Sequence, residues 1–385
     1  MTRKLSAIIG ILLVGALAIA CAPASTPTPP DETEQAPEEE EEEAAPPAAA
    51  DEEAFTWRMQ SPYPEAFPYH QDMVAMCNRI TEMSGGRMQF ETFASGGIVP
   101  AYEELDATVS GTLDAHCGGL SEHRDKFGPV VDLLCQYPGG PTVLQLLAWF
   151  YEGDQAGLQF ERELYSDLNV HVIGPSTTAG PEDEMWSNRK ITSIEDYKGL
   201  KIRTYGEWGN VLASFGASVV TMSGSELYPA MERKVIDALE YSTPANDMTM
   251  HFYEIADYLH YPGIHSPGVT GSHMWVNQDR WNELPDDLKH IVEYAAQHQA
   301  YKGYYTDLYK SGEALQFYED YGVELVKLPD EVQKAIIDKT DEIWAETSAE
   351  DAFFGEVLAS QKAVIEQLGA STLMEPNVVA IRAMD

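Results

Sequence analysis

Hydrophobic residues along this chain alternate between the spacing of helices and that of strands. Met73, Met76, Ile80 and Met83 recur at intervals of three or four residues, which predicts a helix that ends at the glycine pair 85–86. Extended segments are predicted over 57–60, 88–92, 112–117, 170–173, 199–203 and 235–241. Further helices are predicted over 102–109, from residue 285 onward and over 341–368. This alternation predicts an α/β fold in which helices cover parallel or mixed sheets.

Two such α/β units predict two lobes joined by segments that cross between them. The predicted first lobe comprises residues 55–173 and 243–272, and the second comprises 174–242 and 273–340, followed by a C-terminal helix at about 341–368. This architecture is typical of hinged binding proteins and also of several enzyme folds. The fold alone therefore does not decide the function.

The first residues are typical of a bacterial export signal. Two basic residues precede an apolar run, 7–20, that is shorter than the roughly 20 residues needed to span a membrane. The run ends in Ala-Ile-Ala-Cys, which resembles a lipobox, although the usual leucine stands one place further back, as Leu17. We therefore expect a signal peptide over 1–21, lipid on Cys21 and a location outside the cytoplasm. Ordinary signal cleavage, with Cys21 incidental, is the alternative.

Residues 22–54 are rich in Pro, Ala and acidic residues and include the run Glu38–Glu43. Such a segment buries little and repels itself, which predicts an extended, disordered tether ahead of a folded domain over 55–385. The formal net charge is −39, and residues 1–53 hold twelve acids against two bases, so the remainder still carries about −29. This charge argues against nucleic acid and anionic lipid as partners. A site for an anionic solute must then supply positive charge locally.

Cysteines and catalytic motifs add few constraints. Cys77, Cys117 and Cys135 include no CxxC pair, so one disulfide with a free thiol and three buried thiols are both allowed. The ten histidines show no metal-ligand spacing, and the chain contains no GxSxG, P-loop or GxGxxG motif. No nucleophile–base pair stands out, so we do not expect an enzyme.

Residues 198–263 carry a family resemblance. They contain GLK-x-R at 199–203, VIDALE at 235–240, PAND at 244–247 and FYEIADY at 252–258. Further matching motifs are MSGGR at 83–87, VPAYEELDATVSGTLD at 99–114, AWFYEG at 148–153 and WNELPDDLK at 281–289. Together these motifs resemble the solute receptors of tripartite ATP-independent periplasmic (TRAP) transporters, and within them the branch that binds 2-oxo and 2-hydroxy acids.

The resemblance implies a two-lobed periplasmic-binding-protein fold with a hinge and a long helix that braces both lobes. It also implies a receptor that captures a small carboxylate with a cation and delivers it to a membrane permease driven by an ion gradient. In the branch resembled, a C-terminal helix exchanges between partners to make a homodimer, and 341–368 could do so here.

Arg203 and Glu240 match residues that hold the solute and the cation in that branch. Arg203 matches the ligand arginine, and a guanidinium offers the planar pair of donors that a carboxylate fits. Glu240 and Tyr241 match a Glu-Trp pair, in which the glutamate and the next residue's carbonyl hold the cation. Tyrosine in place of tryptophan keeps the carbonyl and an aromatic wall but changes the pocket's shape.

Glu182 departs from the family, which has a glutamine as the third cation ligand. Glu182 is then a charged metal ligand, a partner for a cationic group of the solute, or part of a solvated acidic loop over 182–184; a one-residue slip in the alignment is a further alternative. With the extra negative charge, Ca²⁺ is the expected cation and Na⁺ the alternative.

The solute itself is less constrained. Leu120–Glu122 stands where the family branch has a Tyr-Tyr-Trp cluster, so the tyrosine that would contact the oxo or hydroxyl group is missing, and Ser121 or His123 could take its place. Asn246 and Tyr69 are further candidates for lining the cleft. The leading function is a TRAP receptor for a 2-oxo or 2-hydroxy monocarboxylic acid. An amino acid or zwitterion that meets Glu182, or a non-transport secreted protein, are the alternatives.

Overall fold

The computed structural model describes residues 54–222 and 224–372. The predicted signal peptide, Cys21 and the tether up to residue 53 lie outside these described residues. Among the described residues, no helix is both long enough and apolar enough to cross a membrane.

Five strands form the first sheet. Their order is β2 (Met88–Phe93), β1 (Phe55–Gln60), β3 (Ala115–Gly118), β10 (Val269–Asn277) and β4 (Val170–Ala179). β1 pairs in parallel with β2 and β3, whereas β10 runs antiparallel to both β3 and β4. Helix α1 (Pro68–Met83) begins with proline in its first turn and ends before Gly85 and Gly86, whose positive φ angles of 65° and 88° suit glycine. The helix predicted ahead of this glycine pair is therefore confirmed.

Short helices surround the first sheet. They are α2 (Glu104–Val109), η1 (Leu120–His123), α3 (Arg124–Phe127), α4 (Val130–Cys135), α5 (Val143–Tyr151), α6 (Ala156–Leu164) and α10 (Gln278–Glu283). All of them except α10 contribute apolar side chains to one core beside this sheet, called the first core, for example Leu134, Leu146 and Trp149. Trp281 of α10 belongs to a separate core cluster.

Six strands form the second sheet. Their order is β11 (Glu324–Lys327), β9 (Tyr258–Tyr261), β5 (Met185–Ser187), β8 (Ala238–Leu239), β6 (Lys201–Arg203) and β7 (Ser218–Val220). The helices on this side are η2 (Ile194–Tyr197), α7 (Gly206–Ser214), α8 (Gly224–Glu232), α9 (Pro244–Asp247), η3 (Met248–Met250) and η4 (Phe252–Glu254). The strand predicted over 235–241 shrinks to β8, because the Val235 N–H closes the end of α8 by donating to the Ala230 carbonyl.

The predicted lobe boundaries differ from this arrangement. β4 and β10 pair with each other along almost their whole length, so both stay in the first sheet, to Ala179 and to Asn277. β9 lies in the second sheet, although residues 243–272 were assigned to the first lobe. The chain therefore crosses between the sheets at 180–184, at 262–268 and along α11 (Asp286–Tyr321).

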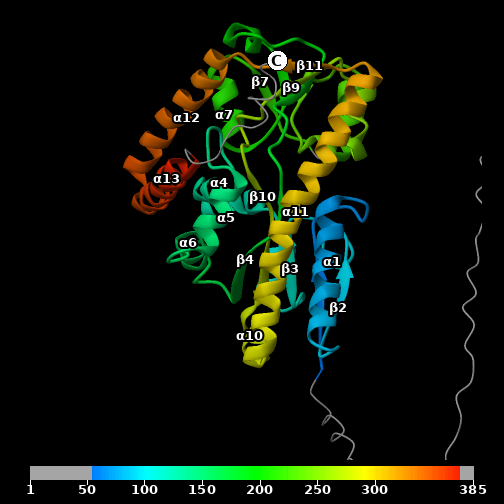
Figure 1. Ribbon diagram of the computed structural model, residues 1–385, viewed down its shortest axis with the longest axis vertical. Coiled ribbons are helices and arrows are strands. Elements are labelled where there is room, and N and C mark those ends of the chain that lie inside the picture. Colours follow the sequence, from blue (N-terminus) through cyan, green and yellow to red (C-terminus); the bar gives the residue numbers. More distant parts are fainter. Residues whose placement is uncertain (1–53, 223, 373–385) are drawn as a thin grey trace, which may run out of the picture. The chain divides into compact units, whose positions relative to one another are not determined.

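Helix α11 is the long bracing helix that the resemblance implied. It extends from α10, beside the first sheet, toward β11 of the second (Figure 1). Gly303 lets it approach β4 closely, since a Cβ there would lie 2.6 Å from the Thr178 carbonyl oxygen. Asp307 then accepts hydrogen bonds from the Gly180 N–H at 2.8 Å and the Thr243 hydroxyl at 2.7 Å. The helix is thereby attached to the first crossover and to the segment after β8.

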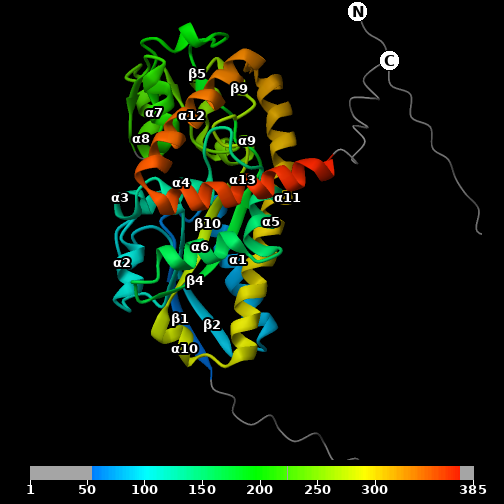
Figure 2. The same cartoon turned by 90° about the vertical axis from the view of Figure 1, so that its left-hand side faces the viewer.

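The C-terminal region is two helices rather than the single one predicted over 341–368. α12 (Asp330–Glu350) ends at Asp351, whose extended φ and ψ of −125° and 108° break the helix, and the Asp351 carboxylate accepts the Phe354 N–H of α13 (Ala352–Thr372) at 3.1 Å. α12 contributes Ile336 to a core beside the second sheet and Trp344 to the first core. α13 packs on α4, α5 and α6 of its own chain, as Figure 2 shows.

All three cysteines of the folded part are buried free thiols, which selects one of the two alternatives left open by the sequence. Cys117 lies 3.3 Å from the Ser176 hydroxyl and Cys77 lies 3.4 Å from the Met59 sulfur, so each packs within the first sheet's core.

Candidate functional site

The two loop segments that cross between the sheets meet each other. The Glu182 N–H, in crossover 180–184, donates to the Ser266 carbonyl of crossover 262–268 at 3.3 Å. Gly263 permits this approach, because a Cβ there would lie 2.1 Å from the Glu182 carbonyl oxygen. The crossover thus buries three consecutive acids, Glu182, Asp183 and Glu184.

His265, on the second crossover, has a carboxylate at each ring nitrogen. Nδ1 lies 3.0 Å from Glu184 Oε2, and Nε2 lies 3.0 Å from Glu182 Oε2. The ring also stacks on Trp208, with 5.6 Å between ring centroids. Burial alone would lower the pKa of His265, but hydrogen bonds to Glu182 and Glu184 and the surrounding negative charge raise it well above its ordinary value. The imidazolium is therefore a positive charge built into the cluster.

Glu240 connects this cluster to the edge of the second sheet. It directly follows β8, and Arg203 ends the parallel neighbour β6, so both lie at the carboxyl ends of their strands. Arg203 donates from Nη1 to the Glu240 carbonyl at 2.5 Å and from Nε to the Met222 carbonyl at 3.2 Å. Glu240 Oε2 accepts the Thr204 hydroxyl at 2.9 Å, and Oε1 lies 4.0 Å from His265 Nε2.

Aromatic rings surround the Arg203 guanidinium. Its Cζ lies 5.3 Å from the ring centroid of Tyr205 and 5.7 Å from that of Tyr241. The Tyr241 ring meets Phe67 at 6.0 Å between centroids, and Phe67 meets Tyr69 at 5.2 Å. Phe67 and Tyr69 lie at the start of α1, on the side of the first sheet. The two sides of the molecule therefore share one aromatic wall next to the arginine.

Tyr69 reaches this wall because β10 has a glycine opposite it. A Cβ at Gly271 would lie 2.4 Å from the Tyr69 ring. The buried Tyr69 hydroxyl is near Ser242 but makes no well-formed hydrogen bond among the described residues. The Tyr69 hydroxyl is close enough to the acidic cluster to feel the charge of Glu182. This charge, together with burial, raises the pKa of Tyr69 well above its ordinary value.

The remaining sequence candidates have different positions. Asn246 is buried in α9, where its Nδ2 donates to the Ser242 hydroxyl at 3.0 Å. Ser121 lines the small cavity beside Glu240 and His265. His123 instead faces the first core, with Nδ1 2.5 Å from the Tyr165 hydroxyl, and burial lowers its pKa to about 3. His123 therefore does not replace the missing tyrosine of the family branch.

Negative charge exceeds positive charge among these buried groups. Burial raises the pKa of Glu182, and burial with neighbouring carboxylates raises those of Asp183 and Asp247 well above their ordinary values. Asp247 accepts the Trp186 indole N–H at 2.8 Å, whereas both Asp183 oxygens lack a partner among the described residues. A cation at this point would offset charge that burial otherwise makes costly.

Three of these residues have the arrangement of metal ligands. Glu182, Glu240 and His265 each offer one ligand atom, and these atoms all lie within 4.8 Å of one another. A cavity of about 20 Å³ adjoins Glu240 and His265. It has room for a water molecule or an ion, because about 10–15 Å³ suffices for one water. A small carboxylic acid is larger, so its entry requires the walls to move apart.

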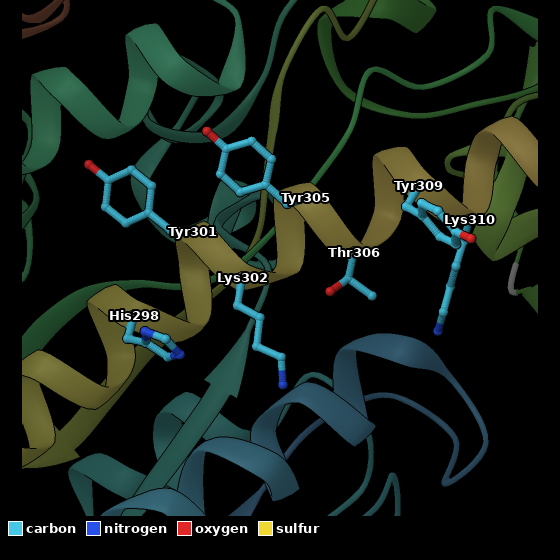
Figure 3. A pocket seen from close by; sticks show the side chains of 7 residues that line it. All are labelled: His298, Tyr301, Lys302, Tyr305, Thr306, Tyr309 and Lys310. Carbon is cyan, nitrogen blue, oxygen red and sulfur yellow. The ribbon is translucent and has the colours of Figure 1, made fainter. Parts of the chain in front are cut away.

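A second hollow, of about 570 Å³, lies along α11 and is a weaker candidate. Its lining residues all belong to that helix: His298, Tyr301, Lys302, Tyr305, Thr306, Tyr309 and Lys310. In Figure 3, Lys302 and Lys310 point to one side of α11, while Tyr301 and Tyr305 point to the other. The side chains do not converge on one ligand, unlike those around Glu240.

No pattern or motif in the sequence pointed to His265. It lies two residues beyond the recognised segment 198–263, in a loop with no periodicity. Its partners Glu182 and Glu184 lie more than 80 residues away along the chain. Only the crossing of the two loops between the sheets brings these groups together.

We expect Asp183→Asn to stabilise the protein increasingly as the pH rises above 4. A folded-state pKa raised above the ordinary 3.8 means that Asp183 contributes stability at low pH that is lost as the pH rises toward the folded pKa. A neutral amide removes this loss, by up to about 1.4 kcal/mol per pH unit. Urea unfolding between pH 4 and 8, in chelator, measures the difference.

The exposed Asp257 supplies the control, because Asp257→Asn changes no buried charge. Equal pH slopes for wild type and Asp183→Asn would contradict a buried, protonated Asp183.

Comparison with known proteins identifies the chain's relatives. Residues 60–351 match the family model DctP, described as bacterial extracellular solute-binding protein, family 7. A protein of Nostoc sp. (strain PCC 7120), named monocarboxylate 2-oxoacid-binding periplasmic protein, is 31% identical over 317 residues, which are 82% of this chain and 85% of that protein.

Solved structures agree with the fold. A TRAP periplasmic solute-binding protein from Pseudoalteromonas atlantica, with bound sodium and pyruvate, has a TM-score of 0.78 and 30% identity, covering 86% of this chain and 100% of that one. One from Colwellia psychrerythraea, with calcium and pyruvate, has a TM-score of 0.78 and 30% identity over 84% and 98% of the two chains. One from Bordetella bronchiseptica, a dimer with calcium and picolinate, has a TM-score of 0.77 and 25% identity over 86% and 98%. The chain belongs to the DctP family of TRAP transporter solute-binding proteins, and it has that family's two-sheet α/β fold.

Proposed function

We propose that this receptor binds a small 2-oxo or 2-hydroxy monocarboxylic acid together with a cation, between the two sheets, and delivers it to a TRAP membrane permease. The observation that carries the proposal is the buried Arg203 guanidinium at a strand end, beside Glu240 and the acidic crossover. The protein is strongly acidic, so an anionic solute needs positive charge nearby, and Arg203 and His265 supply it beside the acidic crossover.

Arg203 receives the solute carboxylate in this proposal. Two backbone carbonyls, those of Met222 and Glu240, hold the guanidinium through Nε and Nη1. These account for two of its five N–H donors, and no other hydrogen bond from it is found among the described residues. The Arg203 guanidinium is therefore held in place before the solute arrives, which reduces the conformational entropy lost on binding.

Glu240, Glu182 and the backbone carbonyl of Tyr241 hold the cation in this proposal, and the cation also contacts the solute carboxylate. Carboxylate and carbonyl oxygens suit Ca²⁺, which tolerates irregular shells, and Na⁺ is the alternative. Relatives with bound sodium or calcium beside pyruvate or picolinate support such a site. The name of the Nostoc relative supports the solute class.

Tyr69 and Asn246 are proposed to line the solute side of the cleft. The Tyr69 hydroxyl, buried without a well-formed hydrogen bond, offers a donor for a solute oxygen. The competing proposal, in which Glu182 meets the ammonium group of an amino acid, is less well supported. Glu182 Oε2 already accepts a hydrogen bond from His265, at 3.0 Å.

Attachment and assembly complete the proposal. Lipid on Cys21 would tether the receptor to the outer face of the membrane, and the mass of the mature protein tests this.

A homodimer would form by exchange of α13 about the break at Asp351, and the Bordetella relative is described as a dimer. Light scattering of the purified protein tests the dimer.

Arg203→Lys is expected to weaken carboxylate binding by about 1.5–3 kcal/mol, because lysine cannot reproduce a two-donor fork. Calorimetry with small 2-oxo acids measures the change. Arg189→Lys is the matched control, since Arg189 bonds the Asp196 carbonyl at 2.9 Å, elsewhere on the second sheet's side. An unchanged affinity in folded Arg203→Lys would show that Arg203 is structural.

Solute binding is expected to change the separation of the lobes. The groups proposed to contact solute come from both sheets, and the present cavity of about 20 Å³ is too small to admit it. The free receptor must therefore open, and the bound state should be the closed one. Small-angle scattering should show compaction on adding solute. An identical profile with and without a ligand of confirmed affinity would argue against hinged capture.

Removal of Ca²⁺ is expected to weaken solute binding. Glu182, Glu240 and the solute carboxylate gather negative charge around one point, which favours a divalent ion with oxygen ligands. Glu182→Gln should relax the requirement toward Na⁺, whereas Glu240→Gln should weaken binding with either ion. Titration of solute in chelator-treated buffer with Na⁺ alone measures this. Full affinity under that condition would exclude a required divalent ion.

A further inference from the structure

We propose that Glu182, Glu240 and His265 also form a site for a divalent transition metal of the Zn²⁺ class in the solute-free receptor. His265 Nε2 is the third ligand, and Glu184 is the positioning residue that orients its ring. The inference rests on the cation site of the proposed function and adds a nitrogen ligand to it. It requires no solute, so the two can be tested separately.

The ligand atoms converge on one point. His265 Nε2 lies 3.0 Å from Glu182 Oε2 and 4.0 Å from Glu240 Oε1, and all three ligand atoms lie within 4.8 Å of one another. One imidazole nitrogen and two carboxylate oxygens at such separations suit a first-row divalent metal, with water completing the shell. The adjoining cavity of about 20 Å³ gives room for one water.

The other face of the imidazole has the partner that metal-bound histidines usually have. Nδ1 lies 3.0 Å from Glu184 Oε2, and that same oxygen accepts the His265 backbone N–H at 3.3 Å. A histidine that binds metal through one nitrogen typically donates from the other to a carboxylate, which fixes its tautomer and orientation. Binding of the metal would release the Nε2 proton to solvent while Nδ1–H stays on Glu184, and the Nε2 lone pair would then point toward Glu182 and Glu240.

An unpartnered atom gives independent support. Glu240 Oε1 is buried, in a residue only 2% exposed, and has no hydrogen-bond partner among the described residues. It faces His265 Nε2 at 4.0 Å, too far for a hydrogen bond. A buried carboxylate oxygen without a partner is costly unless a cation or proton reaches it.

The nitrogen ligand separates this metal class from Ca²⁺ and Na⁺. Ca²⁺ takes oxygen ligands, so it would use the carboxylates and gain nothing from Nε2. Zn²⁺ and its neighbours bind imidazole well. The two metals should therefore compete for Glu182 and Glu240, with Zn²⁺ retained by His265 in the absence of solute.

Cobalt spectroscopy tests the proposal directly. The untagged receptor, treated with chelator and free of solute, is titrated with Co²⁺ while its visible d–d absorption is followed. One equivalent should saturate the signal, and Zn²⁺ should then displace it. His265→Gln should abolish the signal, and Glu184→Gln should weaken Co²⁺ affinity about 10–100-fold.

His273→Gln is the matched control. His273 is also fully buried and bonded to a carboxylate, Glu161, at 2.8 Å, but it adjoins no second ligand carboxylate among the described groups. The variant His273→Gln should therefore leave the Co²⁺ signal unchanged. No saturable signal in the folded wild type, or a signal that survives His265→Gln, would overturn the proposal. If His265→Gln does not fold, unchanged affinity in Glu184→Gln overturns it instead.

Calorimetry of the wild type with Ca²⁺ and small 2-oxo acids separates the two proposals. Solute binding without a Co²⁺ signal rejects the transition-metal site alone. A Co²⁺ signal without binding of any small carboxylate rejects the proposed solute alone.

Discussion

The burial of several carboxylates where the chain crosses between its two sheets is the constraint on which this receptor depends. Glu182, Asp183 and Glu184 occupy one crossover, and Glu240 reaches them from the edge of the second sheet. Such charge is tolerated only with partners, and His265 supplies the nearest one. The same interaction therefore holds the crossovers together and creates the electrostatic demand for a cation.

The crossovers between the sheets and the candidate site coincide for this reason. α11 attaches to the first crossover through Asp307, which accepts the Gly180 N–H and the Thr243 hydroxyl. Thr243 lies three residues after Glu240, so the helix holds the crossover and the segment after β8 together. A cation or solute bound at Glu240, as proposed, would therefore lie next to the crossovers about which the lobes are proposed to move. Binding energy can bias the hinge only through such differential contacts.

The sequence predicted most of what local pattern controls. The helix 68–83 and the strand that ends at Arg203 follow from periodicity and from motifs. Glu240 was predicted inside a strand over 235–241, whereas it directly follows the two-residue strand β8. The lobe boundaries were misplaced because β4 and β10 continue beyond the points where the motifs changed. Their extent depends on antiparallel pairing between segments about 100 residues apart, which no local pattern contains. His265 was missed for the same physical reason.

The substitution at Glu182 is best understood together with His265. Glutamate in place of the glutamine that the family resemblance implies adds one negative charge, and His265 places one positive charge 3.0 Å from the same carboxylate. Glu184 shares the same imidazolium at 3.0 Å. Of the four formal negative charges of Glu182, Glu184, Glu240 and a solute carboxylate, Arg203 and His265 would offset two, and a divalent cation would balance the other two. The carboxylates proposed to hold the cation also raise the pKa of His265 and so keep a proton on this buried histidine in the absence of metal.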